Sequence, residues 1–246
     1  MPDKLLVINQ ATIGYRRGKN TIPVVSGIDA ALNKGEFVAL IGRNGAGKST
    51  LLRTLMVGLK PLHGEMISGG ERIDRLSPTE LARLLSVVLT DNSVPGIMVH
   101  ELVALGRTPH TGFMGRLTTN DRGVVKKSME AMGITHLAER DVASLSDGER
   151  QKCFIAKALA QETPILLLDE PTAFLDYPSK LHLFATLKEL ASKEGKAVLV
   201  STHDLDLALK SADKIWFIEN GRLYQGTPGE LTDNGVLASF MNDTYL

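Results

Sequence analysis

The chain has 246 residues, of which 43% are hydrophobic and 5% aromatic. This composition supplies a sizeable buried core and excludes a disordered or fibrous chain. Lys plus Arg and Asp plus Glu both number 28, and no long basic stripe occurs, which excludes a broad nucleic-acid-binding surface. One cysteine, Cys153, excludes an internal disulfide framework and favours a reducing compartment.

The chain lacks the patterns of secretion and of membrane insertion. The first residues, MPDKLLVINQATIGY, carry too short and too interrupted an apolar run for a signal peptide. The longest apolar runs, FVALIG and PILLLDE, fall short of the roughly 18 to 20 residues that a membrane span needs. We therefore expect a cytoplasmic chain whose membrane association comes only through a partner.

Short apolar runs alternate with segments of helical periodicity. The runs cover residues 37–41, 165–168, 197–200 and 215–218. This alternation predicts the α/β class, with a parallel sheet wrapped by helices. From about 99 to 160 the periodicity is helical throughout, which predicts a helical subdomain at about 95–160 inserted into a single domain spanning 1–246. The segment from GRLYQGTPGEL onward predicts an edge strand followed by a helix.

The first run leads into GRNGAGKS, which matches the motif G-x-x-x-x-G-K followed by Ser or Thr, between the strand FVALI and a helical segment. Its glycines allow a tight turn that aims backbone N–H groups inward, and the following helix adds its positive end, so the loop is suited to phosphate. A merely glycine-rich turn would leave the Lys-Ser pair unexplained. We expect Lys48 to reach the β- and γ-phosphates of ATP and Ser49 to be a Mg²⁺ ligand. The predicted ATP-binding residues of the loop are Gly42, Arg43, Asn44, Gly45, Ala46, Gly47, Lys48, Ser49 and Thr50.

Polar side chains follow the next two runs. Residues 165–168 end in Asp169 and Glu170, and ligand-facing residues lie at the carboxyl ends of strands in open α/β sheets. We expect Asp169 to hold Mg²⁺ through its waters and Glu170 to polarise the attacking water as a catalytic residue. The run AVLVST leads to His203, a second predicted catalytic residue that would hydrogen-bond the γ-phosphate.

LSDGER at 145–150, the helical QKCFIAKALA and then PILLLDEPTAFLD resemble the signature segment, Walker B strand and D-loop of the ABC ATPase family, and the resemblance covers nearly the whole chain. It implies a P-loop NTPase core, an inserted helical subdomain and a small N-terminal antiparallel β part. It also implies that Tyr15 stacks on adenine and that Asp176 is the D-loop acid. The signature residues would act on the ATP of a second copy in a head-to-tail dimer; they are Ser146, Asp147, Gly148 and Glu149.

Two positions depart from the family pattern. The usual signature is LSGGQ, so Asp147 and Glu149 add negative charge near a polyphosphate. ATP affinity would drop unless Asp147 points away, and Ser146 with Glu149 also forms a capping-box pattern. The Q-loop segment LSVVLTDNSVPG contains no Gln, and we expect Thr90, or alternatively Asp91, at that position.

The segment VHELVALGRTPHTGFMGRLTTND is similar, through GR-x-P-H, to importers of iron-siderophore, heme and vitamin B12. The other interpretation of Arg107, Pro109 and His110 is a solvated turn after a helix. The resemblance implies a Mg-dependent ATPase that energises import through a separate membrane permease at the cytoplasmic face of the inner (plasma) membrane, with a substrate-binding protein as an indirect partner.

Two other functions fit the same residues. One is a soluble ABC ATPase that serves as an assembly or scaffold factor without a permease. The other is a nucleotide-binding regulator that hydrolyses ATP poorly because of Asp147 and Thr90.

Overall fold

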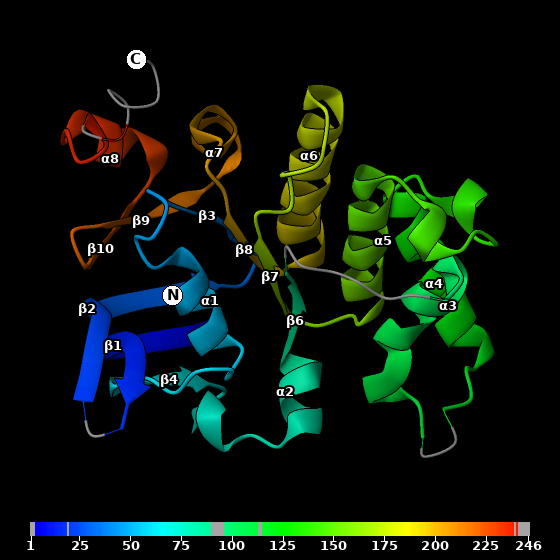
Figure 1. The fold of residues 1–246 in the computed structure, drawn as a ribbon, viewed down its shortest axis with the longest axis horizontal. Helices are drawn as coiled ribbons and strands as arrows, with labels where there is room; N and C mark the ends of the chain where they lie inside the picture. Colours follow the sequence, from blue (N-terminus) through cyan, green and yellow to red (C-terminus); the bar gives the residue numbers. More distant parts are fainter. Residues whose placement is uncertain (1–2, 19, 90–95, 113–114, 239, 241–246) are drawn as a thin grey trace.

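A six-stranded sheet forms the centre of the molecule, with strand order β10-β9-β3-β8-β7-β6 (Figure 1). The computed structural model describes residues 3–18, 20–89, 96–112, 115–238 and 240. Neighbouring strands of this sheet are parallel except β9 and β10, which are antiparallel. The four apolar runs lie in strands of this sheet, which confirms the predicted α/β class. The strands are β3 (Phe37–Gly42), β6 (Leu85–Val88), β7 (Ile165–Asp169), β8 (Ala197–Ser201), β9 (Lys214–Glu219) and β10 (Arg222–Gly226).

The central strands are apolar at nearly every position because the sheet is covered on both faces. In β7, Ile165 and Leu167 belong to the core that includes α1 (Lys48–Leu55) and the N-terminal sheet. Leu166 and Leu168 belong to the core that includes the helices of the insertion. Successive side chains of a strand point to opposite faces, so a strand covered on both sides reads as a continuous apolar run.

The N-terminal part is a four-stranded antiparallel sheet, as the family resemblance implied. Its order is β2-β1-β4-β5. The backbone N–H of Ser26 in β2 donates to the Gly221 carbonyl at 3.0 Å, which joins this sheet to the β9–β10 hairpin. The strands are β1 (Lys4–Arg17), β2 (Asn20–Asn33), β4 (His63–Ser68) and β5 (Glu71–Arg72).

Between β6 and β7 the elements of the described chain are all helical, and they lie on the opposite side of the sheet from the N-terminal strands (Figure 1). The predicted limits of this insertion, about 95 and 160, stay a prediction because residues 90–95 lie outside the described residues. The elements are α3 (Val99–Ala104), the 3₁₀ turns Leu105–His110, Thr135–Leu137 and Val142–Ser144, α4 (Thr119–Ala131) and α5 (Asp147–Ala160).

The remaining helices flank the central sheet. They are α2 (Pro78–Leu84), preceded by a 3₁₀ turn at Ile73–Arg75, α6 (Tyr177–Glu194), α7 (Leu205–Ser211) and α8 (Pro228–Asp233). Within the described ranges, no helix combines the length and apolar content that crossing a bilayer requires.

The GR-x-P-H motif is a structural clamp inside the insertion. The Arg107 guanidinium is 3% exposed. It donates to Asp121 Oδ1 at 2.9 Å, and to the Ala160 carbonyl and Glu162 Oε2 at 2.7 Å each. These bonds tie the start of α4 to the end of α5. The interpretation of Arg107 as part of a solvated turn is therefore wrong, because its charge is buried and paired.

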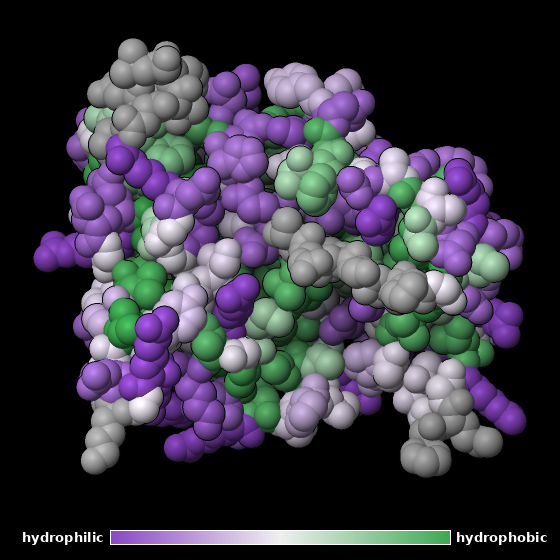
Figure 2. Space-filling view, viewed as in Figure 1, coloured by the Kyte–Doolittle hydropathy of each residue, from purple (hydrophilic) through white to green (hydrophobic). Residues whose placement is uncertain are grey.

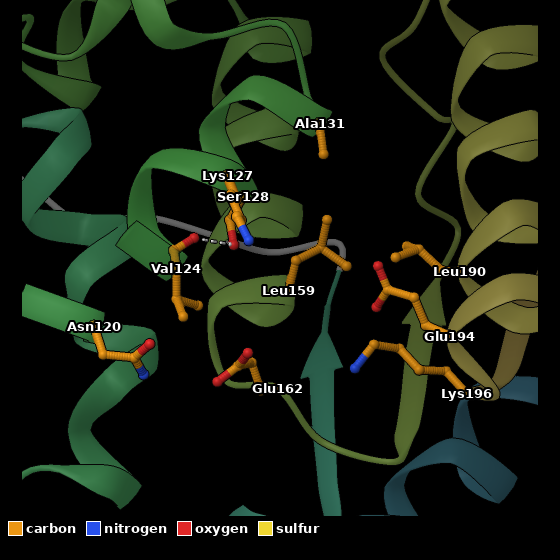
Figure 3. Close-up of a pocket in the computed structure, with 10 residues that line it drawn as sticks. All are labelled: Asn120, Val124, Lys127, Ser128, Ala131, Leu159, Glu162, Leu190, Glu194 and Lys196. Atoms are coloured by element: carbon orange, nitrogen blue, oxygen red, sulfur yellow. Dashed lines mark hydrogen bonds between the residues drawn. The ribbon is translucent and has the colours of Figure 1, made fainter. Parts of the chain in front are cut away.

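A cleft of about 480 Å³ separates α4 from α6 at the junction of the insertion with the core (Figure 3). Val124 and Lys127 line it from the insertion, while Leu190 and Lys196 line it from the core. Lys196 Nζ donates to the Thr163 carbonyl at 2.9 Å, and burial lowers the pKa of this amine. The insertion is therefore packed on the core through α5, with open space beside α4.

The clamp predicts an acid-dependent part of the stability. Hydrogen bonds from Thr118, and then from Arg107, lower the pKa of Asp121 to about 2. Its stabilising effect is therefore complete above about pH 4, the ordinary range of an unfolded aspartate, and is lost as the pH falls through about 2. We expect Asp121→Asn to melt lower than the wild type at pH 7, with the difference shrinking between these two values in thermal unfolding followed by circular dichroism. The exposed Asp233→Asn is the control substitution, and a difference for Asp121→Asn that stays constant with pH would contradict this assignment.

Candidate active site

The phosphate-loop motif forms the turn between β3 and α1, and its glycines adopt conformations that other residues rarely adopt. Gly42, Gly45 and Gly47 have φ angles of 154°, 80° and 117°. A Cβ atom at Gly42 would lie 2.6 Å from the Ile218 carbonyl oxygen, and one at Gly47 would lie 2.8 Å from Cγ1 of Val24. The loop therefore requires glycine both for its backbone angles and for its close approach to neighbouring chain.

Lys48 places a positive charge inside the loop. Lys48 is 7% exposed, and its Nζ donates to the Gly42 carbonyl at 2.8 Å. The same nitrogen lies 3.9 Å from Glu170 Oε1. Together with the N-terminal end of α1, this ammonium makes the loop an anion site.

A cavity of about 370 Å³ adjoins the loop and brings together residues distant in sequence. Tyr15 of β1, Glu170 after β7 and residues 44, 45 and 47–50 of the loop region line it, with Val24 as a further lining residue. The Tyr15 hydroxyl lies 3.1 Å from Thr50 Oγ1, and the residue is 38% exposed. An aromatic face is thus available beside the phosphate loop, while stacking of Tyr15 on adenine stays a prediction.

The ends of β7 and β8 place four polar side chains together. Asp169 Oδ1 accepts a hydrogen bond from Ser201 Oγ at 2.6 Å, and the backbone N–H of Glu170 donates to the same hydroxyl at 2.9 Å. Glu170 Oε2 lies 2.8 Å from His203 Nδ1. The two predicted catalytic residues, Glu170 and His203, are thus in contact, while their catalytic roles stay predictions. Ser201 was missed by sequence reasoning, because a single serine at the end of an apolar run carries no motif.

The donors at this edge fit Mg²⁺. Ser49 supplies an exposed hydroxyl at the start of α1, and Asp169 supplies a carboxylate at the end of β7. Over the described ranges, no group of three or more His, Cys, Asp or Glu side chains could enclose a metal ion. This donor set suits Mg²⁺, which keeps several waters and is held by one or two protein oxygens plus substrate phosphates.

The signature segment caps α5. The Ser146 hydroxyl accepts from the Glu149 N–H at 3.3 Å, and Glu149 Oε2 accepts from the Ser146 N–H at 3.0 Å, so the predicted capping box is present. Hydrogen bonds from the Ser146 hydroxyl, and then from the Ser146 N–H, lower the pKa of the Glu149 carboxyl. The Asp147 carboxylate lies 3.1 Å from a guanidinium nitrogen of Arg150. The extra charge of Asp147 is therefore balanced within its own helix.

Gly148 and Asp176 serve the packing between α5 and the chain after β7. A Cβ atom at Gly148 would lie 3.0 Å from the Phe174 carbonyl oxygen, so glycine permits this close contact. Asp176 caps α6 by accepting from the Ser179 N–H at 3.0 Å. The predicted Q-loop position, Thr90 or Asp91, lies outside the described residues.

The close contact of Gly47 generates a prediction for nucleotide binding. In Gly47→Ala, the new Cβ would press on Val24 and Val25 and the backbone would be strained, so we expect binding of a fluorescent ATP analogue to weaken by about tenfold or more. Gly123→Ala in α4 is the control, because a Cβ atom there meets nothing within 4 Å. Unchanged affinity in folded Gly47→Ala would contradict the assignment of this loop.

Comparisons with known proteins agree with this geometry. The family described as ABC transporter matches residues 25–173. The ferric enterobactin transport ATP-binding protein FepC of Escherichia coli (strain K12) is 42% identical over 224 residues, which cover 90% of this chain and 81% of FepC.

Two solved structures show the same fold over most of the chain. A metal-chelate type ABC transporter in an inward-facing conformation has a TM-score of 0.82 at 27% identity, covering 97% of this chain and 90% of that one. A dimeric ATP-binding cassette in a post-hydrolysis state, bound to ADP and Pi, has a TM-score of 0.80 at 26% identity, covering 91% and 98%. As its signature segment and phosphate loop predicted, the chain belongs to the family of ABC transporter ATP-binding proteins.

Proposed function

We propose that this chain hydrolyses Mg-ATP as the motor subunit of an importer for an iron chelate (siderophore), heme or cobalamin. The observation that carries the proposal is the convergence of Lys48, Asp169 and Glu170, with His203, at one edge of the sheet beside the phosphate loop. The FepC relative is named for ferric enterobactin transport and the structural relative for metal chelates, which supports this class of cargo.

In this proposal, the chain's own groups divide the work of hydrolysis. The phosphate loop and Lys48 hold the phosphates, and Ser49 and Asp169 hold Mg²⁺, which neutralises charge on the phosphates when it is bound. Glu170 orients a water and accepts its proton as the water oxygen bonds to the γ-phosphorus and the bond to the β–γ bridging oxygen breaks. His203 Nδ1 lies 2.8 Å from the second carboxylate oxygen of Glu170, and in this proposal His203 also contacts the γ-phosphate.

The signature segment supports a nucleotide-sandwiched dimer of two copies. Its helix α5 presents an N-terminal end, which favours an anion, and Arg150 balances the charge of Asp147. A polyphosphate bound by the second copy can then approach Ser146 and Gly148 with the charge of Asp147 balanced by Arg150. The dimeric state of a structural relative also supports this arrangement.

An exposed apolar surface supports docking on a membrane permease. Met98, before α3, is 40% exposed, and Leu105, after it, is 48% exposed. Figure 2 shows apolar residues in the middle of the face it draws, around β6 and α2 and beside the helical insertion. A permease segment seated there would hold the motor at the cytoplasmic face of the inner (plasma) membrane, with a substrate-binding protein as an indirect partner and no nucleic acid involved.

Removing the Glu170 carboxylate tests the hydrolytic role. We expect Glu170→Gln to lower the rate of phosphate release by about 100-fold or more, because its amide cannot accept the water proton. We also expect this variant to stay dimeric with ATP. Phosphate release and size-exclusion chromatography measure the two effects. Glu130→Gln, on the exposed surface of α4, should behave as the wild type. Full turnover by Glu170→Gln would refute the assigned role.

The Asp147–Arg150 pair tests the signature assignment. In a Glu170→Gln background, we expect Arg150→Met to raise the protein concentration needed for half-maximal ATP-driven dimerisation by about two- to fivefold, because Asp147 then repels the phosphates. The same substitution in an Asp147→Gly background should have a smaller effect, since no carboxylate remains to be balanced. Equal effects in both backgrounds would show that Arg150 acts otherwise, for example through its bond to the Leu145 carbonyl.

A further inference from the structure

The last residue of β8 is a serine in a place where packing alone favours an apolar side chain. All five residues of β8 are buried, and Ser201 is 0% exposed between β3 and β7. Burying a hydroxyl costs free energy unless it is hydrogen-bonded. The partners of this hydroxyl therefore show what it does.

Both hydrogen bonds of the Ser201 hydroxyl go to the two acids that end β7. Asp169 faces Ser201 directly in the strand register, and Ser201 Oγ donates to Asp169 Oδ1 at 2.6 Å. A short bond from a hydroxyl to a carboxylate is among the stronger hydrogen bonds in proteins. The same oxygen accepts from the Glu170 N–H at 2.9 Å, and the Ser201 carbonyl lies 3.2 Å from that nitrogen.

These bonds fix the orientation of the Asp169 carboxylate and the backbone conformation of Glu170, on which the proposed hydrolysis depends. The bond to Oδ1 restrains rotation of the Asp169 carboxylate. The bonds to the Glu170 N–H hold a residue whose φ angle is 47°, in the left-handed region that side-chain-bearing residues rarely adopt. That backbone conformation directs the Glu170 carboxylate to His203 Nδ1 at 2.8 Å and to Lys48 Nζ at 3.9 Å.

We propose that Ser201 is a positioning residue that couples the metal-holding carboxylate of Asp169 to the water-orienting carboxylate of Glu170. It acts through these two residues and does not itself contact nucleotide. The inference rests on the proposed hydrolysis of Mg-ATP. Removing the hydroxyl should therefore loosen metal binding and slow the chemical step together.

The same sheet offers a matched control. Ser86 in β6 is also a buried strand serine, 2% exposed, and its hydroxyl lies 2.9 Å from Thr163 Oγ1. Ser86→Ala removes a buried strand hydroxyl without touching either acid of the site. If the role of Ser201 were purely structural, Ser201→Ala and Ser86→Ala would have the same Mn²⁺ affinity and the same kcat. They would then differ only in how far each lowers the melting temperature.

The experiment compares the wild type with serine variants. Electron paramagnetic resonance measures how tightly each protein binds Mn²⁺ in the presence of a non-hydrolysable ATP analogue. We expect Ser201→Ala to raise the Mn²⁺ dissociation constant by about tenfold or more, as loss of an outer partner of a metal ligand does. We expect its kcat at saturating Mg²⁺ to fall by about tenfold or more, whereas binding of the analogue without metal should stay within about twofold of wild type, because the phosphate loop is unchanged. Ser86→Ala should match the wild type, and Ser201→Thr, which keeps a hydroxyl, should recover most of the Mn²⁺ affinity.

Ser201→Cys provides a second test if the alanine variant fails to fold, because a thiol fills the space and is a weak donor. Either folded variant binding Mn²⁺ and turning over as Ser86→Ala does would overturn the proposal. A wild-type protein that binds Mn²⁺ with the analogue but releases no phosphate would contradict the proposed function instead. The Mn²⁺ comparison would still decide the role of Ser201 in that case.

Discussion

The register between β3, β8 and β7 places the predicted phosphate-binding and catalytic groups at one edge of the central sheet. Ser201 pairs with Leu40 of β3 on one side and with Asp169 of β7 on the other. Because the three strands are parallel, the phosphate loop, the two acids and His203 must all emerge at the same edge. The strand register therefore sets the position of the site, and the helices, the insertion and the N-terminal sheet surround it.

The charges at this edge balance one another over short distances. Lys48 and the start of α1 supply positive charge that attracts a polyphosphate. Asp169 and Glu170 supply negative charge, which a metal ion can join to that polyphosphate. The signature segment repeats this balance on a smaller scale, with Arg150 beside Asp147. The Asp147 departure from the family's usual signature is therefore accommodated by Arg150 on the same helix.

Sequence reasoning identified the features whose signal is local. The apolar runs in β3, β7 and β8 and the phosphate-loop motif each lie within a few consecutive residues, and the capping box at Ser146 spans four. The N-terminal antiparallel sheet was expected only through the family resemblance, since its pairing joins segments with weak individual patterns.

What sequence reasoning missed depends on partners that are distant along the chain. The sequence leaves Arg107 open between a family motif and a solvated turn, until α4 and α5 bring Asp121 and the Ala160 carbonyl to it. Ser201 reads as the end of an apolar run until the register sets it against Asp169, 32 residues earlier. Tertiary contacts of this kind decide whether a polar residue is solvated, clamped or functional, and no local pattern reports them.

The central claim is that this ATPase drives a separate membrane permease. The most direct measurement is a pull-down from solubilised membranes with Glu170→Gln loaded with Mg-ATP, with the co-purified proteins identified by mass spectrometry and an absorbance spectrum recorded for bound chelate, heme or corrinoid. We predict recovery of a permease with many membrane spans. A soluble dimer that brings down no membrane protein would contradict the claim and favour an assembly or scaffold factor.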